Sequence, residues 1–340
     1  MYQITITAKE EGQRFDKYLH RILPEAGTSF LYKMLRKKNI TLNDRKADGS
    51  EKITEGDCVK IFFAQDTLTK FMGKQSAESR EALSQGTKTA SGCSEYDEAY
   101  QQLSEIQIIY ENDHVLLADK PAGILSQKAA GADISLNEWL IGYLLAKGEL
   151  SEPALPLFKP SVCNRLDRNT SGIVLCAKSL KGAQTLGRLL KERTLHKYYQ
   201  LYVKGRIEEE CLIEGYLVKD EKRNKVTVRP APGSTDQAYI QTKYKPLRIE
   251  TDKTLLEVEL ITGKSHQIRA HLASIGHPLL GDYKYGDRAW NESYRQKYGV
   301  QSQLLHAYKV VFPPLEPPFA DVSGRTFFCE LPEIFARVSS

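Results

Sequence analysis

Residues 164–172 carry the side chains best suited to chemistry. They read Asn-Arg-Leu-Asp-Arg-Asn-Thr-Ser-Gly and lead into IVLCA, an apolar run typical of a buried strand. Asp167 lies between Arg165 and Arg168, and nearby positive charge favours an ionised carboxylate. Such an aspartate can act as a nucleophile toward an electrophilic carbon. The same residue types also suit a turn closed by its own side chains, so these residues alone leave both interpretations open.

Other kinds of catalytic site find little support in the sequence. The glycines are never spaced i, i+2, so the GxGxxG loop of dinucleotide-binding folds is absent, and no GxSxG nucleophile motif occurs. His266 and His271 would lie about 140° apart on a helix, too far around it to share a metal. The six cysteines include no C-x-x-C pair, and we interpret them as reduced, mostly packed thiols. We therefore expect chemistry without a metal or an organic cofactor.

The composition is that of an ordinary soluble protein. Of the 340 residues, 41% are hydrophobic and 27% are charged, and the length favours two domains. No run approaches the ~20 apolar residues of a membrane span, and the first residues lack a basic-then-apolar signal pattern. We expect a cytoplasmic protein with no membrane partner.

The net charge of +5 is distributed unevenly. Residues 33–46 hold six basic residues against one acidic residue, and residues 159–206 hold eleven against two. Between these regions, residues 66–105 hold four basic and seven acidic residues. Two basic regions separated by an acidic stretch indicate two surfaces that face a polyanion, although solvated helix faces would produce the same runs.

The pattern of apolar residues divides the chain into two folded units. Residues 1–64 are expected to form a small α/β domain with short strands and two helices, the second at 29–38 with Phe30, Met34 and Leu35 facing inward. Residues 65–104 are rich in Ser, Gln, Glu, Gly, Lys and Thr, which predicts a flexible linker with room for a short helix.

The second domain, at 105–340, is predicted to belong to the α+β class. Strand patterns dominate residues 211–261, and further strands are expected at 172–177 and 198–203. Helices are expected at 179–192 and 266–274. Strands that follow one another over long stretches favour a largely antiparallel mixed sheet flanked by helices over a doubly wound fold.

Five segments, in this order along the chain, closely resemble the RluA-type family of RNA pseudouridine synthases. They are ADKPAGILSQ (118–127), NRLDRNTSGIVLCAKS (164–179), KERTLHKYYQLYVKG (191–205), LITGKSHQIRAHLASIGHPLLGDYKYG (260–286) and LLHAYKVVFPP (304–314). The stretch before them, from GQRFDKYL (12–19) to GDCVKIFF (56–63), resembles the small S-four-like RNA-binding domain that often precedes this catalytic domain. The resemblance implies an isomerase that needs no cofactor.

The resemblance also implies roles for particular side chains. Asp167 matches the essential catalytic carboxylate; whether it attacks the sugar, attacks the ring or takes a ribose proton stays open. Arg269 matches the arginine that pairs with this aspartate. Tyr199 matches a tyrosine whose ring can stack on the extruded uracil, and Arg165 matches the position that enters the RNA as the target base flips out.

Further basic residues are expected to contact RNA. In the S-four-like unit, the candidates for backbone contacts to structured RNA are Lys33, Arg36, Lys37 and Lys38. In the catalytic unit, the lysines expected to contact phosphates or to support loops are Lys120, Lys264 and Lys284.

One position departs from the family pattern. The central motif usually begins with His before Arg-Leu-Asp, where this chain has Asn164. We interpret this as a variant of the loop, because the aspartate is retained and Asn can still hydrogen-bond locally. The sequence thus predicts a monomeric pseudouridine synthase that acts on large-subunit ribosomal RNA. The alternatives are a synthase for transfer RNA and an RNA-binding or ribosome-assembly factor that has lost catalysis.

Overall fold

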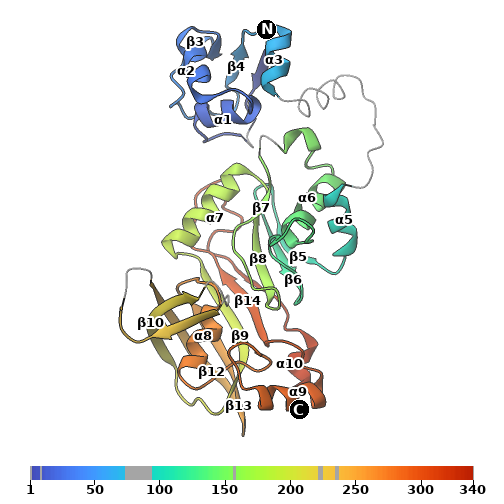
Figure 1. Cartoon of the computed structure of the whole chain (residues 1–340), viewed down its shortest axis with the longest axis vertical. Helices are drawn as coiled ribbons and strands as arrows, with labels where there is room; N and C mark the ends of the chain where they lie inside the picture. The colour runs from blue at the N-terminus through green and yellow to red at the C-terminus, as the bar shows by residue number, and fades with distance from the viewer. Residues whose placement is uncertain are drawn as a thin grey trace.

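Two separate sheets organise the part of the chain that the structure describes (Figure 1). The structure, a computed structural model, describes residues 2–7, 10–72, 94–155, 158–220, 225–233 and 237–339. The smaller sheet lies in the first unit, drawn in blue at the top of Figure 1, and the larger sheet runs through the remainder of the molecule.

The first unit packs helices against a small antiparallel sheet. Across this sheet the strands are β1 (Tyr2–Thr5), β4 (Cys58–Ile61), β2 (Ile40–Leu42) and β3 (Arg45–Lys46). The helices are α1 (Phe15–Ile22), α2 (Thr28–Arg36) and α3 (Gln65–Met72). Helix α1 is amphipathic: its residues Phe15, Tyr18, Leu19 and Ile22 share one face and are all buried in the core of this unit.

Helix α2 differs from its predicted span of 29–38. It ends at Arg36, because Lys38 adopts a left-handed backbone conformation with φ 60° that cannot continue a right-handed helix. Leu31 faces the core in place of Phe30, whose ring is half-buried among other aromatic rings at the edge of the core.

The segment predicted as a flexible linker, residues 65–104, is helical at both ends. Helix α3 places Leu68 and Met72 in the core of the first unit. Helix α5 (Glu95–Gln102) belongs to the second unit. Short helices of this kind gain their stability from tertiary packing, which composition does not reveal. The centre of the segment, residues 73–93, lies outside the described residues.

Helix α5 packs closely on helix α6 (Leu136–Ala146). A glycine permits the approach: a Cβ added to Gly142 of α6 would lie only 2.1 Å from the carbonyl oxygen of Tyr96. Ser135 caps the start of α6, since its hydroxyl accepts a hydrogen bond from the backbone N–H of Asn137.

The large sheet contains eleven strands within the described residues. Its main path runs β11-β10-β12-β13-β9-β14-β8-β6-β5, with β15 beside β14 and β7 beside β8. The strands are β5 (Gln107–Glu111), β6 (Val115–Lys120), β7 (Ser161–Val162), β8 (Ser171–Ala177), β9 (His196–Lys204), β10 (Cys211–Asp220), β11 (Lys225–Arg229), β12 (Ala238–Ile249), β13 (Lys253–Leu260), β14 (Leu305–Val311) and β15 (Thr326–Phe328). Among these, β14 and β8 form a parallel pair and the other pairs are antiparallel.

Helices cover both faces of the central strands. Leu116 of β6 packs in the same core as α6 and α8, whereas the next residue, Leu117, packs with α7. This alternation is the period of a strand that is buried on both faces. The elements that complete the unit are η1 (Glu152–Ala154), α7 (Leu180–Glu192), α8 (Gln267–Ser274), α9 (Arg288–Tyr298) and α10 (Glu333–Arg337).

The architecture confirms the predicted α+β class, with a largely antiparallel sheet flanked by helices. The division at 64/65 and 104/105 into binding domain, linker and catalytic domain stays a prediction. Throughout the ranges that the structure describes, every helix is too short or too polar to cross a lipid bilayer.

Candidate active site

The loop that carries Asp167, between β7 and β8, is held by hydrogen bonds from two sides. Leu166 is buried, and the Ser126 hydroxyl accepts from its backbone N–H and donates to its carbonyl oxygen, both at 3.0 Å. Asn164 Oδ1 accepts from the backbone N–H of Leu175 at 2.7 Å. The residue that departs from the family pattern therefore supports the loop.

Lys120 holds the same loop from the end of β6. Its side chain is fully buried, and Nζ donates to the carbonyl oxygens of Pro121 and Ile124 at 2.8 Å and of Arg168 at 3.1 Å. Three acceptors match the three N–H donors of an ammonium group. Of the two roles expected for Lys120, its geometry is that of loop support.

The register of the sheet sets this loop beside β9. Ala307 of β14 pairs with Gly172 on one side and with Tyr199 on the other. The pairing with Gly172 is close, because a Cβ added to Gly172 would lie 2.3 Å from the carbonyl oxygen of Ala307. The φ of Gly172 is 105°. Glycine suits this position because it has no Cβ. Asp167, a few residues before Gly172, is thereby brought close to Tyr199.

Asp167 is paired with Arg269 of α8. Arg269 Nη1 donates to Asp167 Oδ2 at 2.8 Å, while Nε and Nη2 donate to the two carboxylate oxygens of Asp282 at 2.7 and 3.0 Å. Burial of the guanidinium disfavours its charge, but the two carboxylates outweigh this effect and raise the pKa of Arg269. Arg269 thus presents one fixed, charged donor to a carboxylate that is still partly exposed.

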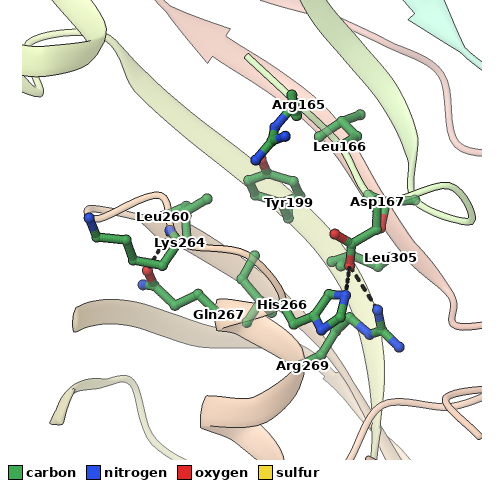
Figure 2. A pocket seen from close by; sticks show the side chains of 12 residues that line it. Arg165, Leu166, Asp167, Tyr199, Leu260, Lys264, His266, Gln267, Arg269 and Leu305 are labelled. Atoms are coloured by element: carbon green, nitrogen blue, oxygen red, sulfur yellow. Dashed lines mark hydrogen bonds and ion pairs between the residues drawn. The ribbon is translucent and has the colours of Figure 1, made fainter. Parts of the chain in front are cut away.

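Asp167 and Arg269 border a pocket (Figure 2). Its lining also includes the ring of Tyr199 and four apolar side chains, namely Leu166, Leu260, Ile268 and Leu305. Burial and the charge of Asp167 both raise the pKa of Tyr199, so its phenol stays protonated. An aromatic face next to a carboxylate suits a flat, polar ring that is held by stacking.

Two cations lie at the exposed edge of this pocket. Arg165 and Lys264 both line it, and both side chains are exposed. Figure 2 shows Arg165 beside the Tyr199 ring, on the side of the pocket away from Arg269. The pocket thus brings together Asp167, Arg269, Tyr199 and Arg165, the residues that were predicted to act on the substrate uridine.

The basic residues predicted to bind RNA in the first unit lie elsewhere. Lys33 and Arg36 belong to the last turn of α2, and Lys37 and Lys38 follow directly. All four side chains are exposed. In Figure 1, α2 lies at the opposite end of the molecule from α8 and α9.

Two residues of the site were not predicted, Asp282 and His266. Asp282 is wholly buried, and His266 lines the pocket with Nε2 3.9 Å from Asp167 Oδ2. His266 was weighed only as a metal ligand. The sequence did contain a signal for a residue such as Asp282. A buried arginine has five N–H donors, which a single carboxylate cannot satisfy, so a second acceptor had to be present.

Within the described residues, no three His, Cys, Asp or Glu side chains are placed to hold a metal ion. The described cysteines have free thiols, at Cys58, Cys163, Cys176, Cys211 and Cys329. Cys93 lies outside the described residues.

The chain is similar to known proteins over most of its length. A family model described as RNA pseudouridylate synthase matches residues 114–274. Ribosomal large subunit pseudouridine synthase C of Vibrio vulnificus is 30% identical over 317 residues, which cover 90% of this chain and 87% of that protein. The protein of the same name from Vibrio cholerae is 28% identical over 317 residues, which cover 91% of this chain and 88% of its own.

A solved structure shares the fold. Human RNA Pseudouridylate Synthase Domain Containing 4 aligns with a TM-score of 0.56 and 21% identity, over 71% of this chain and 94% of its own. The residues matched by the family model include Asp167, Tyr199 and Arg269. This chain belongs to the RluA-type family of RNA pseudouridine synthases and is an isomerase.

Proposed function

We propose that this enzyme isomerises specific uridines in large-subunit ribosomal RNA, with Asp167 as its catalytic carboxylate. The observation that carries the proposal is the pairing of Asp167 with Arg269 at 2.8 Å on the border of a pocket that also holds the Tyr199 ring. The choice of RNA rests on relatives of similar length that are named for the ribosomal large subunit.

The reaction breaks the bond between uracil N1 and the ribose, rotates the base and rejoins it through C5. It needs no external reagent, so the site has to hold the extruded nucleotide and stabilise the separated base. Tyr199 supplies a stacking face, a contact worth about 1–3 kcal/mol per base. Asp167, paired with Arg269, lies next to that face as the reacting group.

Arg165 fills the space that the flipped base leaves in the RNA. Its side chain is exposed at the edge of the pocket, with no ion-pair partner among the described residues, so it is available to enter a helix. A planar cation in that space offsets part of the few kcal/mol that base flipping costs.

The first unit is an S-four-like domain that positions the RNA through phosphate contacts. Lys33, Arg36, Lys37 and Lys38 form an exposed basic cluster at the end of α2. Structured RNA is recognised mainly by shape and backbone, which suits a cluster of flexible cations.

The alternative of an inactive RNA-binding factor rested on Asn164. Its side chain supports the loop through Leu175 and does not line the pocket beside Asp167. The substitution of His by Asn at this position is thus compatible with catalysis.

Pseudouridine mapping tests the proposal. Total RNA is compared from cells that carry the wild type, the Asp167→Asn variant or no protein. A mark in large-subunit ribosomal RNA that depends on the wild type and is lost in the variant supports the proposal and names the uridine. A dependent mark in transfer RNA overturns the choice of substrate, a mark that persists with Asp167→Asn overturns the role of this residue, and identical maps overturn the function. Thermal unfolding checks that the variant is folded.

A further inference from the structure

The hydroxyl of Tyr285 joins a backbone amide to the imidazole of His266. The backbone N–H of Val226 donates to Tyr285 Oη at 3.0 Å, and the same oxygen lies 2.8 Å from His266 Nδ1. An amide N–H can only donate, so Tyr285 Oη is the acceptor of that bond. The phenol has one hydrogen of its own, and within the described residues the recorded partner left for it is His266 Nδ1.

This arrangement favours one tautomer of His266. If Nδ1 accepts from Tyr285, the single proton of the neutral imidazole is on Nε2. Burial lowers the pKa of His266, and the charges of Arg269 and Lys284 act in the same direction against that of Asp167. The ring is therefore neutral near pH 7, with its protonation pattern set by Tyr285.

The Nε2–H of His266 remains available to a ligand. Nε2 lies 3.9 Å from Asp167 Oδ2, which is too long for a hydrogen bond. No described residue forms a hydrogen bond with Nε2, and Figure 2 shows this edge of the ring directed toward Asp167 at the pocket. The N–H therefore offers the pocket a donor without a formal charge.

Several other donors in the pocket are already engaged or charged. Arg269 uses Nε, Nη1 and Nη2 on two carboxylates, and Gln267 Nε2 donates to Gln241 and Thr242. Arg165 and Lys264 are exposed cations at its edge. A uridine presents carbonyl and ribose oxygens, which are acceptors that a neutral N–H can bind beside the Asp167 carboxylate.

We propose that His266 binds an acceptor oxygen of the extruded uridine through Nε2–H, and that Tyr285 is a positioning residue that fixes this tautomer. The proposal rests on the proposed function for the identity of the nucleotide. Tyr285 acts through His266, and neither residue forms a covalent bond to the substrate.

The tautomer is measured on the RNA-free protein by ¹⁵N NMR of labelled histidine, with the His266 signals assigned by their loss in His266→Gln. We expect Nε2 to be protonated and Nδ1 unprotonated in the wild type. In Tyr285→Phe the Nδ1 resonance should move, because it loses its donor. A proton on Nδ1 in the wild type, or no response to Tyr285→Phe, would overturn the role of Tyr285.

Two substitutions at His266 separate a binding role from a structural one. His266 adopts a left-handed backbone conformation with φ 55°, which Asn tolerates better than Gln. The longer Gln side chain, however, can place an amide N–H near the position of Nε2, whereas Asn reaches only the position of Nδ1. His266→Asn should therefore be the more stable variant, and His266→Gln should be the more active one if the proposed N–H donor matters.

Activity on the RNA segment that carries the mapped uridine decides between the two roles. We expect kcat/KM to fall about 10–100-fold in His266→Asn, the effect of losing one buried hydrogen bond, and clearly less in His266→Gln. His277→Gln is the matched control, because His277 bonds the carbonyl oxygen of Lys204 and does not line the pocket; it should retain full activity.

Equal losses in both His266 variants, a larger loss in His266→Gln, or no loss in either would overturn the binding role. A wild type without any mapped uridine would overturn the proposed function and with it the named ligand. The NMR measurement needs no activity, so it decides the part of the proposal that concerns Tyr285 in either case.

Discussion

Asp282 accepts two hydrogen bonds from Arg269, at 2.7 and 3.0 Å, and its carboxylate is wholly buried. One further guanidinium nitrogen, Nη1, reaches Asp167. A bidentate pair fixes the plane of a guanidinium as well as its position. The orientation of the donor that faces Asp167 is therefore set by a carboxylate on the other side of the arginine.

This relationship predicts that stability and activity respond differently to two variants. Arg269→Gln leaves the Asp282 charge buried without a counterion, which should lower the free energy of unfolding by about 3–5 kcal/mol. The double variant Arg269→Gln/Asp282→Asn has no such charge and should regain most of the loss. Urea denaturation measures both.

Activity should stay low in both variants, since each lacks the cation that pairs with Asp167. A double variant that recovers activity together with stability would show that Arg269 acts only through folding. A single variant as stable as the wild type would show that the buried pair does not stabilise the protein.

The pairing of Asp167 with Arg269 could be predicted because each residue lies in a distinctive contiguous segment. Asp282 lies in one of these segments too, but its partner is defined only when the loop after α8 brings it within hydrogen-bonding distance of Arg269. His266 was missed for a similar reason: its role depends on Tyr285 and on a β11 amide, and no spacing in the sequence reports that contact.

The fold shows the same division between local and tertiary information. Strands and long helices have periodic apolar residues, and the α+β fold class was predicted correctly from them. The positions of α3 and α5 at the ends of the segment at 65–104 could not be predicted, because both helices are short and their helical state depends on the surfaces against which they pack. On α2, helical spacing alone did not distinguish Phe30 from Leu31 as the inward residue.

Gly172 should tolerate no side chain. Gly172→Ala places a Cβ 2.3 Å from the Ala307 carbonyl oxygen at a φ of 105°, so either β14 or the Asp167 loop has to move. We expect the free energy of unfolding to fall by several kcal/mol and the activity to be lost. Chemical denaturation and turnover measure the two effects.

Gly187→Ala is the matched control. Gly187 lies within α7, and a Cβ there meets nothing within 4 Å. The change should raise the free energy of unfolding by up to about 1 kcal/mol, because Ala favours a helix. Similar effects at the two positions would contradict the close pairing of Gly172 with Ala307.

His306 should make stability depend on pH. Burial lowers its pKa to about 4, whereas an unfolded histidine has a pKa of about 6.5. Between these values the unfolded state binds a proton that the folded state excludes, so stability falls as the pH is lowered and is unaffected above this range. From pH 7 to pH 5 the expected loss is about 2 kcal/mol.

The contribution of His306 is isolated by comparison with His306→Gln, which does not titrate there. Other groups titrate alike in the wild type and in His306→Gln. Between pH 7 and pH 5 the wild type should therefore lose about 2 kcal/mol more of its free energy of unfolding than the variant does. A difference that is constant with pH would contradict a neutral, buried His306.

Charge reversal at Lys37 and Lys38 should weaken RNA binding without unfolding the protein. Both side chains are exposed at the end of α2, so Lys37→Glu/Lys38→Glu removes contacts to phosphate and no packing. Each lost phosphate contact should lower the slope of log affinity against log salt by about 1. Arg288→Glu/Lys297→Glu on α9, which reverses two exposed cations at the opposite end of the molecule in Figure 1, changes the net charge by the same amount and is the control. A change in overall charge would affect both variants, whereas a lost phosphate contact would affect only Lys37→Glu/Lys38→Glu. Equal salt slopes for the two variants would therefore place the RNA away from α2.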